Sequence, residues 1–418
     1  MPENLKPRQS AVRILSRVLN DQKTVDAAIF EEKDYTSYSD SDRHFIKLLI
    51  LTTLRRLGQI DIVLNKTLQK PLPQKQQIIL QILRLGLAQY LFLNIPAYAV
   101  LNTSVSLTRR FHRDGLSGLV NGVLRHITRL KNPLQSANDP ALNIPSWLFS
   151  SWKQAYSETI ARQIAESVLT PPPLDISVLK DTEIWATRWH GIVLPTGSIR
   201  VPLTNPADLP GFKENAWVQN ASAAIPAQLF TDIRGKRVAD LCAAPGGKTL
   251  QLAARGAHVT AIDISENRLK KLMENIHRLH MENSVIPLAS DIMDLPEDNL
   301  FDAVLLDAPC SATGTLARHP KLKYHRAADD IDRLSELQKK LLHKALALLK
   351  PGGELIFSTC SLQAPEGDSV IATALDKAII THPTENFLKP HLTSFGSLRI
   401  LPFDGFDGFY ICRLRKKI

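Results

Sequence analysis

Apolar residues in the first 130 positions recur at three- and four-residue spacing, which is typical of amphipathic helices. Ile14 and Val18 illustrate this spacing. The stretch 76–94 is apolar enough to be the buried central helix of a bundle, and the helical pattern returns over 118–130. The pattern therefore predicts an all-helical N-terminal domain.

A different pattern follows this helical part. Residues 131–146 are rich in Pro, Asn and Ser, which is typical of a linker, and short strand-like pieces lie between 174 and 202. We expect a linker and a small α+β subdomain over 140–220. No internal repeat or low-complexity tract is visible.

From residue 237, apolar runs of strand length alternate with helical patterns. This alternation predicts parallel strands joined by right-handed crossovers, hence a doubly wound sheet. The strands are apolar on both sides, so we expect them to be buried between helix layers. The predicted strands are 238–242, 258–263, 285–289, 301–307 and 354–359.

Ligands in such folds bind at the carboxyl ends of the parallel strands. Polar residues stand at or just after the ends of all five predicted strands: Asp240, Asp263, Asp291, Asp307 and Cys360. We therefore expect these side chains to converge on one edge of the sheet.

The turn after the first strand is a candidate cofactor site. Small residues and two glycines let backbone N–H groups approach a ligand at the start of the next helix. The alternative is a plain tight turn, and the spacing of a nucleoside triphosphate-binding loop is absent. The turn consists of Cys242, Ala243, Ala244, Pro245, Gly246, Gly247 and Lys248.

Two aspartates are candidates for holding the adenosine part of a cofactor. Asp263 ends the second strand about 20 residues further on, where an acidic side chain meets ribose hydroxyls in dinucleotide-binding folds. The alternative is a helix N-cap, a position for which Ser265 competes. Asp291 could accept a hydrogen bond from an adenine amino group, although aspartate is common in loops.

Four cysteines stand at positions 242, 310, 360 and 412. Apolar packing is the usual role of a free cysteine, and it suits Cys412 best and Cys242 reasonably. Cys310 and Cys360 have Pro, Gly and Ser neighbours, which predict exposed loops on the same rim as the cofactor turn.

Paired thiols suit methylation of carbon 5 of cytosine, a weak nucleophile. Thiolate addition at carbon 6 makes carbon 5 reactive towards a methyl sulfonium. A carboxyl group such as that of Asp307 would stabilise charge at ring nitrogen 3, and a cation such as Lys248 would lower the pKa of the attacking thiol. The second cysteine would serve as base. This reasoning leaves open which cysteine attacks, and a Pro-Cys attacker, as in DNA cytosine methyltransferases, would favour Cys310.

The positive charge is concentrated at the N-terminal end. Residues 1–140 hold 20 Lys and Arg against 11 Asp and Glu, whereas 141–418 hold 31 against 30. A basic module joined to a nearly neutral one suggests a bound polyanion, and the alternative is a solvated helical surface.

No apolar run reaches 18 residues and no secretory signal is visible. Four scattered cysteines fit neither a disulfide framework nor a metal site, so we expect a cytoplasmic protein without metal. Nothing in the sequence suggests a dedicated dimer interface, so we expect a monomer.

Several motifs resemble the RNA 5-methylcytosine methyltransferases of the NOL1/NOP2/Sun family. They are DLCAAPGGK, DAPCSATGTLARHP, KPGGELIFSTCS and DGFDGFYICRL, and the resemblance covers roughly 145–418. SAVRILSRVL, SDRHFIKLLILTTLRRLGQID and LNTSVSLTRRF are similar to the helical NusB family. The combination resembles bacterial methyltransferases of small-subunit rRNA.

The resemblance implies three parts: a NusB-like RNA-binding domain over 1–135, a linker with a small RNA-recognition subdomain over 140–220, and a Rossmann-like class I methyltransferase domain over 221–418. It implies S-adenosyl-L-methionine as cofactor and 16S rRNA, at cytosine 967, as substrate.

It also implies that Cys360 is the nucleophile, that Cys310 releases the product and that Asp307, beside Lys248, contacts the cytosine. The implied cofactor shell is 242–248 with Asp263, Arg268, Asp291 and Asp307.

The chain departs from the family pattern at two places. Val218-Gln219-Asn220 stands where Val-Gln-Asp is usual, and Pro365-Glu366-Gly367-Asp368 stands where Glu-Asn-Glu is common. A non-catalytic RNA-binding factor and a DNA cytosine methyltransferase are the rival interpretations. Intact DAPCS, TCS and PGGK motifs oppose the first, and a different arrangement around the DNA-modifying cysteine opposes the second.

Overall fold

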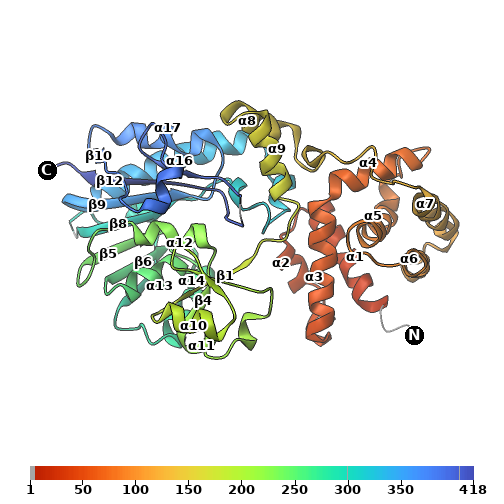
Figure 1. Ribbon diagram of the computed structural model, residues 1–418, viewed down its shortest axis with the longest axis horizontal. Coiled ribbons are helices and arrows are strands. Elements are labelled where there is room, and N and C mark those ends of the chain that lie inside the picture. Colours follow the sequence, from red (N-terminus) through yellow and green to blue (C-terminus); the bar gives the residue numbers. More distant parts are fainter. Residues whose placement is uncertain (1–4, 299, 404) are drawn as a thin grey trace. The chain divides into compact units, whose positions relative to one another are not determined.

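The computed structural model describes residues 5–298, 300–403 and 405–418, which divide into two compact units (Figure 1). The helical unit comprises Met1–Thr170 together with His319–His325. The sheet unit comprises Pro171–Arg318 and Arg326–Ile418. The break at Thr170 lies inside the range expected for the connecting subdomain, whose limits of 140 and 220 stay a prediction.

The first seven helices of the helical unit pack around one apolar core. Its central helix α5 buries Ile82, Leu85 and Leu87 completely, and α1 contributes Ile14 and Leu15. The predicted helical character of the first 130 residues is confirmed. The helices are α1 (Leu5–Asn20), α2 (Val25–Phe30), α3 (Asp40–Arg55), α4 (Leu57–Thr67), α5 (Gln77–Phe92), α6 (Ala97–Arg110), α7 (Ser117–Arg129), α8 (Ser146–Ala155) and α9 (Glu158–Ser167).

A short segment from late in the sequence completes this unit. In α15 (Leu322–His325), Lys323 Nζ donates to the backbone oxygen of Arg55 at 3.1 Å. Tyr324 Oη donates to the oxygen of Leu54 at 3.0 Å, and the ring nitrogen Nε2 of His325 lies 3.2 Å from the oxygen of Val18. The chain therefore enters the helical unit twice, which no local sequence pattern predicts.

The ammonium group of Lys323 is buried, which disfavours its charged form. Burial, with the charges of Arg55 and Arg56, lowers the pKa of Lys323 to about 7 from 10.5. Below pH 7 the group is charged in both the folded and the unfolded chain, so the whole cost of burying it applies. As the pH rises from about 7 to 10.5 the folded chain gives up the proton first, and that cost is relieved.

We therefore expect Lys323→Met to stabilise the helical unit by on the order of a few kcal/mol at pH 6 and by much less near pH 10. Thermal unfolding of the full chain at both pH values measures this difference. Lys75→Met, at an exposed lysine of the same unit, is the control. An equal effect of Lys323→Met at the two pH values would contradict the expectation.

The first sheet of the sheet unit is small and antiparallel. Its strand order is β2-β3-β1-β4, and Trp189 and Ile176 lie in its core. The carboxylate of Asp175 on β1 is fully buried and accepts from Arg200 Nε on β3 at 2.7 Å. The elements are β1 (Leu174–Val178), α10 (Thr182–Arg188), β2 (Ile192–Val193), β3 (Ile199–Val201), α11 (Phe212–Asn215) and β4 (Ala216–Val218).

The second sheet has the order β10-β12-β9-β8-β5-β6-β7, with β11 paired to β12. The strands from β9 to β7 in this order are parallel, as predicted, whereas β12 runs antiparallel to β9 and makes the sheet mixed. The strands are β5 (Arg237–Leu241), β6 (His258–Asp263), β7 (Val285–Ala289), β8 (Phe301–Asp307), β9 (Leu349–Thr359), β10 (Ala378–Ile380), β11 (Leu398–Ile400) and β12 (Phe409–Lys416).

Helices cover both faces of this sheet (Figure 1). Successive residues of β5 point to opposite faces, so Val238 packs with α13 and α14 and Ala239 with α16. The doubly wound arrangement is confirmed. The helices are α12 (Ala221–Gln228), α13 (Gly247–Ala254), α14 (Glu266–Arg278), α16 (Ala328–Ala347) and α17 (Asp368–Ile371).

The expectation that all five strands are buried is wrong for β7. This strand lies at the edge of the sheet, and Ile286 and Leu288 are exposed. Pro287, which cannot donate to a further strand, stands between them, as edge strands allow. The apolar run alone did not distinguish an edge strand from a central one.

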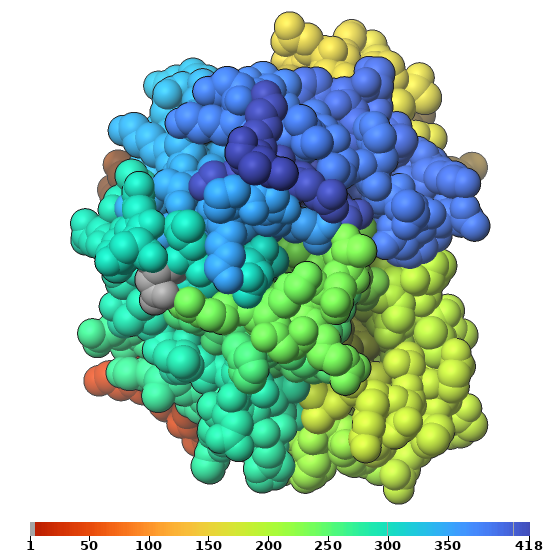
Figure 2. Space-filling view, turned by 90° about the vertical axis from the view of Figure 1, so that its left-hand side faces the viewer, coloured from red at the N-terminus to blue at the C-terminus, as the bar shows by residue number. Residues whose placement is uncertain are grey.

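The last strand ends at the surface of the sheet unit. Figure 2 shows the dark blue C-terminal residues there, and Ile418 is fully exposed. None of the described helices is long and apolar enough to cross a membrane.

Candidate functional site

The strand order places a switch point between β5 and β8, because the chain moves outward through β6 and β7 and then returns to the other side of β5. Crevices for ligands form outside the carboxyl ends of the strands at such points. Asp307 ends β8, and Cys360 follows the last residue of β9. The predicted convergence of these residues on one edge follows from this topology.

The turn from β5 to α13 depends on Gly246. This residue has φ +105°, and a Cβ atom there would overlap the side chain of Leu272. The neighbouring Ala243 donates its backbone N–H to the oxygen of Ile262 at 2.9 Å, which ties the turn to β6. These two constraints fix the conformation of the turn, and α13 begins directly after it at Gly247.

Asp263 is buried beneath the same turn. Its carboxylate accepts from the backbone N–H groups of Ala244 at 3.1 Å and Ser265 at 3.0 Å. Arg268 lies 3.3 Å from Asp263 and also donates to the oxygen of Ala244. Ser265, not Asp263, caps α14, because its side chain accepts from Arg268 N. The two acceptor oxygens of Asp263 thus stay beside the turn.

Asp291 lies apart from this buried cluster. It is exposed, and its side chain accepts from Met293 N at 2.9 Å as the cap of a short 3-10 helix, Ile292–Asp294. The local contacts account for an aspartate at this position, so its role toward adenine stays a prediction.

A second buried carboxyl group lies in β5. Burial raises the pKa of Asp240 to about 7, and Thr249 Oγ1 donates to one of its oxygens at 2.5 Å. The other oxygen, Oδ1, is buried without a hydrogen-bond partner among the described residues. The charges of Asp307 and Asp263 add to the effect of burial on the pKa of Asp240, so the three carboxyl groups form one cluster at this edge of the sheet.

Lys248 and Asp307 form an ion pair across the switch point. Lys248 Nζ lies 2.7 Å from Asp307 Oδ2, and Ser358 Oγ donates to Asp307 Oδ1 at 2.8 Å. Burial alone would lower the pKa of Lys248, but the charge and hydrogen bond of Asp307 outweigh it and raise the pKa. Lys248 therefore stays charged at neutral pH.

The two cysteines at the rim meet. The Sγ atoms of Cys310 and Cys360 are 3.5 Å apart, and both residues are half-buried. The hydrogen bond to Cys360, then burial and the charges of Cys360 and Glu366, raise the pKa of the Cys310 thiol well above its usual value. Cys310 therefore holds its proton more tightly than an ordinary cysteine, and either sulfur can donate in the contact between them.

The loops that carry the cysteines are not exposed, contrary to the prediction. Ser311, Thr359 and Ser361 are completely buried. The polar neighbours that suggested exposure are satisfied instead by an internal carboxylate, that of Glu366. Sequence reasoning marked 365–368 only as a departure from a motif and missed this contact.

The remaining cysteines lie where packing explains them. Cys412 is buried in β12, as expected. Cys242 is half-buried, and burial raises the pKa of its thiol. Neither thiol is prepared for nucleophilic attack.

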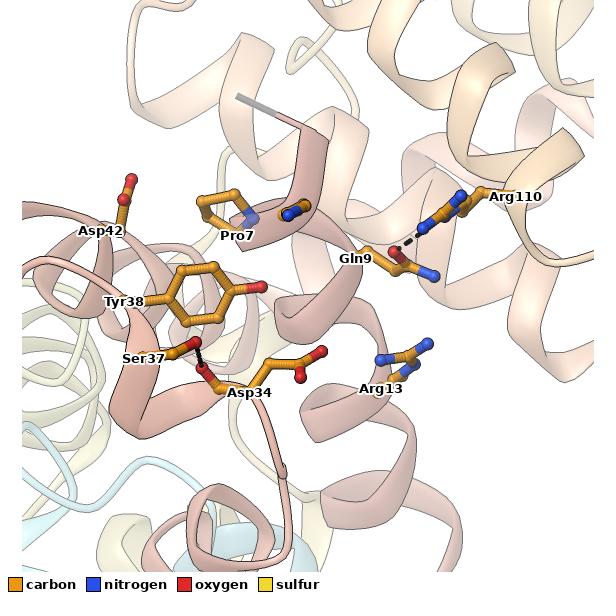
Figure 3. Close-up of a pocket in the computed structure, with 9 residues that line it drawn as sticks. Pro7, Gln9, Arg13, Asp34, Ser37, Tyr38, Asp42 and Arg110 are labelled. Atoms are coloured by element: carbon orange, nitrogen blue, oxygen red, sulfur yellow. Dashed lines mark hydrogen bonds between the residues drawn. The ribbon is translucent and has the colours of Figure 1, made fainter. Parts of the chain in front are cut away.

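The helical unit carries a polar pocket of about 650 Å³ (Figure 3). Arg13 from α1 and Arg110 from α6 approach it on one side, and Tyr38 and Asp34 lie across from them. Arg110 Nε donates to Gln9 Oε1 at 3.3 Å. The lining residues are Lys6, Pro7, Gln9, Arg13, Asp34, Ser37, Tyr38, Asp42 and Arg110.

The fold and the site define a methyltransferase. The family described as 16S rRNA methyltransferase RsmB/F matches residues 228–415, and the NusB family matches 5–129. The chain belongs to the RsmB/F methyltransferase family.

Relatives over nearly the whole chain agree with this assignment. The ribosomal RNA small subunit methyltransferase B of Proteus mirabilis (strain HI4320) is 36% identical over 396 residues, which are 88% of this chain and 91% of the relative. The protein of the same name from Yersinia pseudotuberculosis serotype O:1b (strain IP 31758) is 34% identical over 98% of both chains. A crystal structure of a methyltransferase homologue from Pyrococcus horikoshii is 31% identical, with a TM-score of 0.58 over 68% of this chain and 99% of that one.

Proposed function

We propose that the protein transfers a methyl group from S-adenosyl-L-methionine to carbon 5 of a cytosine in 16S rRNA, at position 967. In this proposal Cys360 forms a covalent bond with the base and Cys310 resolves the intermediate. The observation that carries the proposal is the contact of the two sulfur atoms, 3.5 Å apart. The names of the relatives support rRNA as the substrate.

Cys360 is the attacking residue in this scheme. The hydrogen bond to Cys360, burial and the neighbouring charges raise the pKa of the Cys310 thiol, so Cys310 is the poorer nucleophile of the pair, and the Cys360 sulfur is the electron donor in this proposal. Its sulfur adds to carbon 6 of the cytosine, and the electron pair of the carbon 5–carbon 6 double bond moves towards ring nitrogen 3. Ring nitrogen 3 takes up a proton from solvent as this charge develops, and Asp307, held by Lys248, would accept the resulting N–H hydrogen bond.

Cys310 becomes a base only after this attack. Two causes of its raised pKa, the hydrogen bond to Cys360 and the charge of Cys360, disappear once that sulfur is bonded to carbon. Carbon 5 then attacks the methyl group of the donor, whose sulfur keeps the electrons of the broken bond, and carbon 5 now carries both a methyl group and a proton. Cys310 can release its own proton to solvent and take the proton from carbon 5. The electrons of the broken C–H bond restore the double bond and expel the Cys360 thiolate.

The turn 242–248, with Asp263 and Arg268, would hold S-adenosyl-L-methionine, which supplies an electrophilic methyl group. Asp263 would accept from ribose hydroxyls, because its carboxylate lies directly beneath the turn. Asp291 and Asp307 complete the proposed shell.

Methyl incorporation from a labelled donor into 16S rRNA fragments tests the proposal, with bisulfite sequencing to locate the methylated cytosine. We expect one modified cytosine in RNA and none in DNA of the same sequence. Absence of donor binding in calorimetry would favour a non-catalytic RNA-binding factor, and methylation of DNA would favour the other rival.

The helical domain, 1–135, is proposed to bind RNA. Charged pocket residues such as Lys6 and Arg110 can neutralise phosphates. We expect the double variant Lys6→Ala/Arg110→Ala to weaken RNA binding roughly three- to tenfold and to lower the slope of log affinity against log salt by about 1 for each cation removed, hence by about 2. Filter binding at several salt concentrations measures both. Lys75→Ala, outside the pocket, is the control, and an effect of the same size there would leave the pocket without a specific role.

A further inference from the structure

Glu366 lies under both cysteine loops, at the end of the 3-10 helix Ala364–Glu366, and is completely buried. Its Oε1 atom accepts from Ser311 N at 2.8 Å and from Gln338 Nε2 at 3.0 Å. Its Oε2 atom accepts from Ser311 Oγ and Ser361 Oγ, both at 2.5 Å. One carboxylate therefore takes four hydrogen bonds, three of them from the two cysteine loops.

The two serines that share Glu366 are the sequence neighbours of the two cysteines. Ser311 follows Cys310 and Ser361 follows Cys360, so the shared Oε2 atom links the residues next to the two sulfurs. The backbone oxygen of Glu366 also accepts from Thr359 Oγ1 at 3.2 Å, on the other side of Cys360.

Further hydrogen bonds connect the same loops. Gly314 N donates to the oxygen of Cys360 at 3.0 Å, which joins the loops through the backbone. Gln338 of α16, which contacts Glu366, also donates to the oxygen of Pro309 at 2.9 Å. Gln338 and Glu366 together therefore hydrogen-bond to the residues on both sides of Cys310, Pro309 and Ser311.

Burying a carboxylate costs hydration free energy that an apolar side chain of similar size would not lose. No ion pair with Glu366 offsets this loss among the residues that the structure describes. An apolar side chain could fill the volume but could not accept from three donors on two separate loops. The chemistry of the site therefore favours a role in placing those loops over a role in packing alone.

We propose that Glu366 is a positioning residue that fixes the sulfur atoms of Cys310 and Cys360 relative to one another. This inference rests on the proposed function, because the two sulfurs act on adjacent carbons of one ring. Misplacing a reacting group by about 1 Å can cost on the order of 100-fold in rate, so a shared anchor for both loops has a direct catalytic consequence.

The variant Glu366→Gln tests this role with little change of shape. The amide nitrogen cannot accept a hydrogen bond, so at least one loop donor loses its partner. We expect single-turnover methyl transfer to fall roughly 10- to 100-fold, while the dissociation constant for S-adenosyl-L-methionine changes less than about twofold.

Asp368→Asn is the matched control, an acid-to-amide change two residues away. Asp368 Oδ1 accepts from Ser397 and Tyr410, and in the described part of the chain its carboxylate makes no hydrogen bond to either cysteine loop. We expect this variant to retain the wild-type rate within about twofold.

Single-loop variants keep the test decisive if Glu366→Gln does not fold. Ser311→Ala and Ser361→Ala each remove one hydroxyl donor and leave the carboxylate in place. Each should slow methyl transfer. Where Glu366→Gln does fold, combining it with Ser361→Ala should cost less than the product of the two single effects, because both break the same contact.

The formation of the covalent adduct gives a separate measure. In a Cys310→Ser background, where product release is blocked, Glu366→Gln should slow adduct formation as well. Wild-type activity in Glu366→Gln, or an equal loss in Asp368→Asn, would overturn the inference alone. A loss of cofactor affinity as large as the loss of rate would do the same. If the protein with unchanged cysteine loops gives neither methyl transfer nor, with Cys310→Ser, a covalent adduct, the proposed function is wrong. This inference is then wrong as well.

Discussion

The Cys310→Ser variant is expected to accumulate a stable covalent complex with its RNA, whereas Cys360→Ser is expected to form none. A serine hydroxyl at position 310 cannot serve as base, so attack by Cys360 proceeds and release fails. At position 360 a hydroxyl is too weak a nucleophile, and methyl transfer should fall on the order of 10³-fold or more. The retarded band on a denaturing gel, with peptide mapping of the attached nucleotide, measures the adduct.

Cys412→Ala is the control for this pair, because Cys412 is a buried thiol in β12 outside the site. It should behave as the wild type in both assays. A trapped adduct from Cys360→Ser would reverse the two roles, and would require Cys310 to attack although its pKa is raised.

Asp307→Asn is expected to lower methyl transfer by about 10²- to 10⁴-fold, the range typical of a lost acid–base group. The change removes the carboxyl group proposed to accept the hydrogen bond from ring nitrogen 3. It also leaves Lys248, whose Nζ lies 2.7 Å from that carboxylate, without its counter-charge. Single-turnover rates with saturating donor measure the effect.

Ser358→Ala is the matched control for Asp307→Asn. It removes the 2.8 Å hydrogen bond to Asp307 Oδ1 but keeps the carboxylate. We expect a loss of less than about tenfold, in line with a single hydrogen bond. Equal losses in the two variants would mean that orientation of Asp307, and not its charge, matters.

The sequence predicted four of the five parallel strands to within one residue because each is a compact apolar run bounded by turn residues. β8, for example, covers the predicted 301–307. The fifth, β9, begins at Leu349 and not at the predicted 354, because the polar segment 350–353 hides its first half. Periodicity could not place β7 at the edge of the sheet, since strand order is a property of the whole chain.

The candidate site was predicted as far as strand ends determine it. Parallel strands bring Asp307 and the turn before Lys248 to one edge, and the 2.7 Å ion pair follows. The contact of Glu366 with both cysteine loops could not be predicted, because it depends on side chains 55 and five positions apart in sequence. No local pattern distinguishes such a buried acid from a solvated one.

The double entry of the chain into the helical unit has a practical consequence for anyone dividing this protein. A fragment that stops at Thr170 would lack α15 and would leave the carbonyl oxygens of Val18, Leu54 and Arg55 without the partners that His325, Tyr324 and Lys323 provide. Tyr324 also packs against the apolar core of the bundle, so its removal opens a gap there. An autonomous version of this bundle needs either the heptapeptide 319–325 grafted back or a redesigned surface beneath it.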